Sequence, residues 1–166
     1  MPNNILKKYG SKTTLTAAVA SLASDTNLLA GLQSSVIDNT TDGFDDILLS
    51  GKVTTGTNPV AARQIEVWAV AWDGVNYPDV FTATSASRTI TSSDIKNAIC
   101  KAVAIMSTNA TSDRVYHFTG VSLRQAFGGE LPSKVVLFVV HNTGVALNAT
   151  AGNHEFSYVG TYPQVQ

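Results

Sequence analysis

Short apolar runs alternate with turn residues along most of this chain, a pattern typical of an all-β protein. The strongest run, KVVLFVVH at residues 134–141, is followed by Asn142-Thr143-Gly144, which favours a sharp turn. An unbroken apolar strand leaves neither of its faces polar, so we expect it at the centre of a sheet with both faces covered. The outer cover would come from a loop, from the N-terminal segment or from another subunit.

Other segments show related patterns. Residues 64–72, QIEVWAVAW, present two largely apolar faces and predict a second central strand, with Ile65, Val67 and Ala69 on one face. Further strands are predicted at residues 28–37, 46–53, 80–84, 114–121 and 155–161. Seven or eight strands with Gly, Asn and Asp turns between them indicate an antiparallel two-sheet sandwich.

Two short segments carry helical signals. Residues 95–106 fit either helical spacing or a strand, and Thr91 with Asp94 resembles a capping box. We favour a short helix or turn at residues 92–97 followed by a strand. A single helical turn is also expected at residues 122–127.

The first 26 residues differ from the rest in composition. We predict that residues 1–26 form an N-terminal arm ahead of a sandwich domain at residues 27–166. Leu15, Val19 and Leu22 have helical spacing, but the neighbouring threonines weaken a helix. The arm is therefore expected to be extended or partly helical.

Composition narrows the classes of function. Charged residues make up 14% of the 166 residues, against about 25% in ordinary domains, which suggests that part of the surface lies against partners. A net charge of -1 argues against nucleic-acid binding, since phosphate contacts need clustered Lys and Arg. No apolar run approaches the ~20 residues of a membrane span, and the start of the chain does not resemble a signal peptide. We expect a protein made in a cytoplasm, with neither a nucleic-acid nor a membrane partner.

The chain shows no recognisable reaction or cofactor motif. His117, His141 and His154 lack the spacing of a metal site, and the acidic segment at residues 38–46 lacks the frame of a calcium loop. There is neither a nucleophile elbow nor a phosphate loop. Cys100 lies in an apolar neighbourhood and is expected to pack as a small hydrophobic residue. We therefore predict a protein that is not an enzyme and needs no cofactor.

One loop carries two aromatic residues. In the sequence WDGVNYP, Trp72 and Tyr77 flank turn residues and an aspartate. Aromatic rings beside Asp and Asn suit a sugar-binding platform, but Trp and Tyr are equally typical of protein interfaces. Packing beneath the loop is the third interpretation.

Three segments together resemble a known group of proteins: residues 21–41, residues 45–72 and residues 127–162. They are similar to small virion structural proteins of tailed bacteriophages, in particular jelly-roll capsid cement or decoration proteins. The most specific part is FGGELP, followed by a strand, by HNTG and by a last strand. The resemblance covers residues 21–162.

The resemblance implies an all-β jelly roll of about eight strands with an N-terminal arm. It implies a homotrimer that binds the major capsid protein, with no catalytic residues, and a place on the virion capsid after synthesis in the bacterial host cytoplasm. A carbohydrate-binding, receptor-binding or tail-associated sandwich is the alternative. The residues expected at interfaces are Leu15, Val19, Leu22, Trp72, Tyr77 and Phe127.

Overall fold

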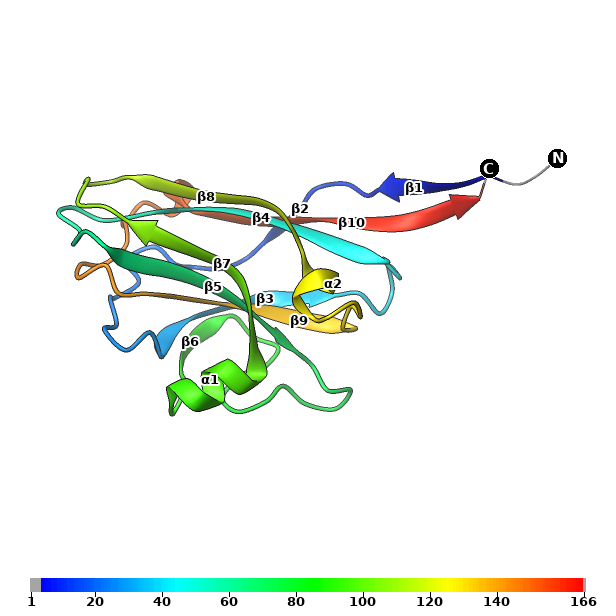
Figure 1. Ribbon diagram of the computed structural model, residues 1–166, viewed down its shortest axis with the longest axis horizontal. Coiled ribbons are helices and arrows are strands. Elements are labelled where there is room, and N and C mark those ends of the chain that lie inside the picture. The colour runs from blue at the N-terminus through cyan, green and yellow to red at the C-terminus, as the bar shows by residue number, and fades with distance from the viewer. Residues whose placement is uncertain (1–3, 166) are drawn as a thin grey trace.

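The computed structural model describes residues 4–165, which form two antiparallel five-stranded sheets (Figure 1). The strands are β1 (Ile5–Tyr9), β2 (Thr13–Leu15), β3 (Ala30–Asp38), β4 (Asp46–Thr54), β5 (Arg63–Ala71), β6 (Ala86–Thr89), β7 (Cys100–Thr108), β8 (Val115–Ser122), β9 (Lys134–His141) and β10 (Glu155–Val165). The helical elements are α1 (Ser93–Ile99), α2 (Leu123–Ala126) and the short η1 (Ala151–Asn153). Sheet A has the order β1-β10-β4-β8, with β2 also paired to β10, and sheet B has the order β6-β3-β9-β5-β7.

The predicted all-β antiparallel sandwich is confirmed. It contains ten strands rather than eight, because the predicted arm contributes β1 and β2, both paired with β10. The arm is thus extended and part of sheet A, without a helix in its described residues. Residues 1–3 of the predicted arm and residue 166 of the predicted sandwich domain lie outside the described residues.

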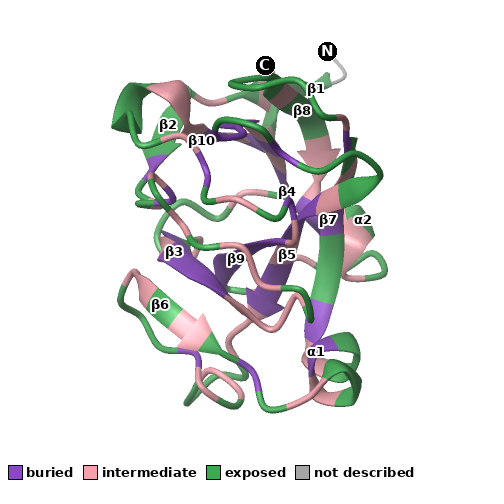
Figure 2. Ribbon diagram, turned by 90° about the vertical axis from the view of Figure 1, so that its left-hand side faces the viewer, coloured by how far each residue is buried: buried purple, intermediate pink, exposed green. Residues whose placement is uncertain are grey.

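Strand β9 lies at the centre of sheet B and is apolar on both faces, as its sequence predicts. Val135, Leu137 and Val139 belong to the main core between the sheets. The alternate residues, Val136, Phe138 and Val140, belong to a second core on the other side of sheet B. Figure 2 shows buried residues concentrated on β3, β9 and β5. Each such side chain contributes about 1.5–3 kcal/mol when fully buried.

The second core is covered by residues 72–99, a segment that runs from the end of β5 through β6 and α1 (Figure 1). We call this segment the covering layer. Phe81 and Ile90 from this layer are 3% and 1% exposed, and the Phe81 ring meets Phe138 edge-on at 5.2 Å. The sequence left open whether a loop, the N-terminal segment or another subunit covers the outer face of β9. In the structure a loop segment of the same chain covers it.

The strand predicted at residues 80–84 is wrong, and the layer's strand is β6 instead. The reason is the buried amide of Gln33, which occupies the backbone groups that a sheet would use. Its Nε2 donates to the carbonyls of Thr82 and Thr84 at 2.6 and 2.9 Å, and its Oε1 accepts from the Thr82 N–H at 3.2 Å. The Arg88 Nε donates to the same Oε1 at 3.0 Å.

The favoured interpretation of residues 92–106 is confirmed, because α1 is followed directly by β7. The helix cap lies one residue later than the sequence suggests. Ser92, rather than Thr91, has extended backbone angles, and its Oγ accepts from the Ile95 N–H at 3.3 Å. The predicted turn after β8 is also present as α2, where the Ser122 Oγ accepts from the Gln125 N–H at 2.9 Å.

A buried ion pair joins the covering layer to sheet B. The Lys96 Nζ lies 2.8 Å from Glu66 Oε2, and both side chains are 7% exposed. The Trp68 indole N–H donates to the same oxygen at 2.8 Å, and Lys96 also donates to the Leu28 carbonyl at 2.9 Å. The ammonium lies 4.8 Å from the centre of the Trp68 ring. These partners compensate two charges that would otherwise be costly to bury.

We expect Lys96→Met to lower the free energy of unfolding by about 3–5 kcal/mol, because it leaves the Glu66 carboxylate buried without a counter-charge. The double variant Glu66→Gln/Lys96→Met should recover much of this loss, since it removes both charges and keeps an acceptor for Trp68. Equilibrium denaturation in urea measures the difference. Lys12→Met, which removes the exposed Lys12–Glu155 pair, is the control and should change little. Equal losses of stability in Lys96→Met and Lys12→Met would contradict the stabilising role of the buried Lys96–Glu66 pair.

Candidate functional site

The two ends of the described chain form a narrow ribbon that extends beyond the body of the sandwich (Figure 1). Strand β4 pairs with β10 only as far as Thr161, whereas β1 pairs with β10 from Thr161 to Val165. Residues 5–9 and 161–165 therefore make a two-stranded element, which we call the terminal ribbon. Among the described strands, β1 pairs with β10 alone, so its other edge is open.

One face of the terminal ribbon is apolar and exposed. Ile5 pairs with Val165 and Tyr9 with Thr161, so the side chains of Ile5, Lys7, Tyr9 and Val165 share a face. Ile5, Tyr9 and Val165 are 70%, 62% and 61% exposed. A two-stranded ribbon is at best marginally stable alone in water, and clustered exposed apolar residues mark interaction sites. The terminal ribbon is thus the strongest candidate for a binding surface.

The base of the terminal ribbon is anchored to the body of the sandwich. Phe44 lies against Gly160, where an added Cβ would collide with the ring. The ring centres of Phe44 and Tyr162 are 6.3 Å apart. The Gly10 N–H donates to the Gly160 carbonyl at 2.8 Å, and the Asp45 N–H donates to the Thr161 carbonyl at 2.7 Å. These contacts fix the direction in which the ribbon leaves the body.

The terminal ribbon is also basic. Residues 5–9 and 161–165 contain Lys7 and Lys8 and no acidic residue. Within residues 4–165, neither lysine forms an ion pair. Lysines on an open edge discourage pairing with a like strand, so the edge favours a partner that carries negative charge.

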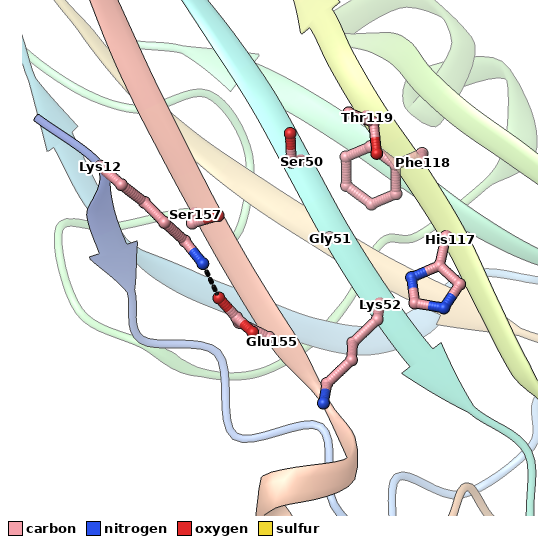
Figure 3. Close-up of a pocket in the computed structure, with 9 residues that line it drawn as sticks. All are labelled: Lys12, Ser50, Gly51, Lys52, His117, Phe118, Thr119, Glu155 and Ser157. Atoms are coloured by element: carbon pink, nitrogen blue, oxygen red, sulfur yellow. Dashed lines mark hydrogen bonds and ion pairs between the residues drawn. The ribbon is translucent and has the colours of Figure 1, made fainter. Parts of the chain in front are cut away.

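A shallow polar groove of about 180 Å³ lies on the surface of sheet A (Figure 3). Glu155, Lys52 and His117 form a row across three strands, because Lys52 pairs in register with each of the other two. Lys12 forms an ion pair with Glu155, and the hydrogen bond from Lys12 lowers the pKa of that carboxyl group. Hydroxyl groups from β4, β8 and β10 line the rest of the groove. It offers hydrogen bonds to a polar ligand on an open surface.

Four residues expected at interfaces contact the main core instead. Leu15 and Val19 are 4% and 0% exposed and belong to that core. Leu22, in the arm, and Phe127, at the end of α2, are partly buried and pack against it. In this structure these side chains are used by their own chain, and they attach the arm and α2 to the sandwich.

The loop after β5 exposes a residue that the sequence did not single out. Tyr77 packs against the second core, its hydroxyl is buried without a partner, and burial raises its pKa to about 12. Trp72 is half-buried, with the Lys134 ammonium 5.1 Å from its ring centre. Val75, at the tip, is 78% exposed and lies between the exposed Asp73 and Asp79.

The exposed residues of the terminal ribbon were also missed from the sequence. The available signals were the apolar ends of ILKKY at residues 5–9 and a final segment, TYPQV, that continues beyond the predicted strand at residues 155–161. Both signals are short, and neither reveals that the two segments pair.

His141 joins the arm to the end of β9. It is fully buried, and its Nε2 donates to the Leu22 carbonyl at 3.0 Å. Its Nδ1 lies 3.0 Å from the Thr143 hydroxyl. Burial lowers the pKa of His141, and this effect outweighs the opposing hydrogen bonds and the nearby Asp25. The ring is therefore neutral at pH 7, and the Thr143 hydroxyl beside Nδ1 donates to the Val145 carbonyl at 3.0 Å.

Within residues 4–165, no group of three or more His, Cys, Asp and Glu side chains is arranged to hold a metal ion. No helix in the same residues has the length and apolarity needed to cross a membrane. No protein-family model matches the chain, and neither a curated protein nor a solved structure matches it.

We expect stability to depend on pH through His141. The unfolded chain gains a proton near the ordinary pKa of 6.5, while the folded chain, whose His141 pKa is lower, does not. The free energy of unfolding should therefore decrease as the pH falls through about 6.5. His141→Gln should reduce this slope, and His117→Gln, which removes an exposed histidine, is the control. Denaturation at a series of pH values tests this; identical slopes in the two variants would refute it.

Cys100 should be unreactive in the folded protein. Its side chain is buried, and burial raises the pKa of the thiol to about 12, so almost no thiolate is present at pH 8. Reaction with a disulfide reagent should begin only on unfolding. A Ser107→Cys substitution, at an exposed position on the same strand, provides a matched thiol that should react at once. Equally fast labelling of both thiols would show that Cys100 is accessible.

Proposed function

We propose that this protein is a non-enzymatic structural subunit of a tailed-phage virion, a cement or decoration protein that binds the major capsid protein shell. The observation that carries the proposal is the terminal ribbon, which presents three largely exposed apolar residues on one face beside an open strand edge. Both features are suited to another protein surface: apolar side chains supply contact area, and an open edge accepts main-chain hydrogen bonds. The sequence resemblance supplies the virion context.

We further propose that strands β2–β5 and β7–β10 form a jelly roll. The strand orders β2-β10-β4-β8 and β3-β9-β5-β7 support this, since each sheet takes its strands from both halves of the chain. Strands β1 and β6 are then additions at the edges. Viral capsid proteins and lectins both use this architecture, so it is compatible with the proposed function and with the alternative below.

Binding through the terminal ribbon would leave the sandwich unchanged. The tip of the ribbon contributes no residue to either core, whereas its base is fixed by Phe44. A partner that covers the apolar face would gain the burial that the ribbon lacks in the free chain. Such a subunit stabilises a shell by linking neighbouring surfaces, and a homotrimer would supply three ribbons.

A carbohydrate- or receptor-binding module, including one in the tail, is the second candidate. The groove on sheet A favours it, because Ser50, Thr119 and Ser157 bring hydroxyl groups together around a shallow polar surface (Figure 3). Sugar hydroxyl groups are recognised by polar side chains of this kind. In this case the groove, rather than the ribbon, would carry the affinity.

The triple variant Ile5→Ser/Tyr9→Ser/Val165→Ser should lose shell binding at least tenfold, because it removes the exposed apolar face without touching a core residue. Empty shells of the phage's major capsid protein are mixed with the variant, sedimented and imaged. Ile105→Ser removes an apolar residue of similar exposure, 52%, from β7 and is the control. Undiminished shell binding by the triple variant would rule out the ribbon as the contact. Ribbon-independent binding to immobilised glycans would instead support the second candidate.

A further inference from the structure

We propose that copies of this chain associate head to tail, with the terminal ribbon of one copy seated on the Asp73–Asp79 loop of the next. The inference rests on the proposed function and goes beyond it, because it gives the ribbon a second copy of the chain as its partner when no shell is present. It depends on two surfaces of the same chain whose charge and apolar character are complementary.

The first surface is the apolar face of the terminal ribbon. Lys7 lies on this face between Ile5 and Tyr9, with Val165 opposite Ile5. The face thus presents one cation framed by exposed apolar groups. It has no counter-charge of its own within residues 4–165.

The second surface is the tip of the loop that leads into the covering layer. Val75 is the most exposed of the large apolar residues described, at 78%, and Asp73 and Asp79 flank it. Hydrogen bonds from the Val75 and Asn76 N–H groups hold the Asp73 carboxylate in place and lower its pKa, so it is charged at neutral pH. The tip thus presents an exposed apolar group beside the Asp73 carboxylate, with the exposed Asp79 further along the same loop, whereas the ribbon face presents a cation among apolar groups.

The cations near this loop already have partners of their own. The Lys134 ammonium, 5.1 Å from the centre of the Trp72 ring, forms an ion pair with Asp38. Lys96 is buried against Glu66. Arg88 directs its guanidinium to Gln33 on β3 and to Thr82 and Thr84 in the covering layer. No ion pair within residues 4–165 involves Asp73 or Asp79. Both carboxylates are therefore available to the ammonium of another copy.

The geometry favours a head-to-tail contact over a two-fold contact. A two-fold pairing of β1 with β1 centred on Lys7 would place two ammonium groups opposite each other, which is destabilising. The ribbon continues sheet A, while the loop belongs to the layer outside sheet B (Figure 1). Because the two surfaces are different parts of the chain, their contact is heterologous and forms a closed ring if the rotation between copies closes.

Complementation between two defective variants tests this inference. Lys7→Glu/Tyr9→Ser damages the ribbon, and Val75→Ser/Asp79→Asn damages the loop; Asn tolerates the positive φ of 53° at position 79. In sedimentation velocity, the wild-type chain should form assemblies larger than a dimer, and each variant alone should remain a monomer. An equimolar mixture should form a dimer, because the intact ribbon of one variant meets the intact loop of the other.

A monomeric mixture beside an associated wild-type chain would overturn the head-to-tail contact, and a loop variant that associates by itself would overturn it in favour of ribbon-to-ribbon pairing. A wild-type chain that stays monomeric at all concentrations would overturn it as well. Circular dichroism of each variant confirms that the fold is kept, and Ile105→Ser should associate like the wild type. Shell binding is measured separately: if ribbon variants lose shell binding while self-association is unchanged, the proposed function stands and this inference fails.

Discussion

The fold depends on one strand, β9, that is apolar on both faces and must be buried on both. Strand β9 places Val135, Leu137 and Val139 in the main core and Val136, Phe138 and Val140 in the second core. A two-sheet sandwich buries only one face of each sheet, so an apolar central strand needs a further layer. Residues 72–99 provide that layer, and Phe81 from this segment packs edge-on against Phe138 of β9.

Buried polar groups on the sheets fasten the segments that are not strands. Glu66 holds α1 through Lys96, Gln33 holds the chain at Thr82 and Thr84, and His141 holds the arm at Leu22. Each group is largely or fully buried and has partners for its polar atoms. Groups of this kind resemble reactive residues in a sequence, but in this fold they act as structural links. The free-energy cost of burying these polar groups is low only while all their hydrogen-bond partners stay in place. This requirement makes the attachment of each segment to the sheets specific.

The sequence predicts the central strands well, because their pattern is strong and local. Residues 64–72 and 134–141 owe their position to apolar side chains on both faces, which any sandwich must bury. The prediction at residues 80–84 failed because the competing amide, Gln33, is about fifty positions away in the chain. Strands β1 and β2 could not be predicted for the same reason, since their partner β10 lies at the other end of the sequence.

The candidate sites were harder to predict than the fold. Spacing identified Leu15 and Val19 as apolar and important, but not whether they face a partner or the core. Likewise, the aromatic residues of the Trp72 loop attracted attention, whereas the exposed side chain is the smaller Val75. Exposure depends on what the rest of the chain covers, and a local pattern does not contain that information.

The terminal ribbon follows from unequal strand lengths. Strand β10 continues past Thr161, where β4 stops, and β1 is the one described strand that pairs with its remaining residues. A narrow ribbon whose apolar residues are exposed gains little stability from its own side-chain contacts, so in the free chain its tip is at best marginally stable. A partner surface would stabilise the ribbon, because it would bury the apolar side chains that the sandwich leaves exposed. The low proportion of charged residues in the chain is consistent with such a surface.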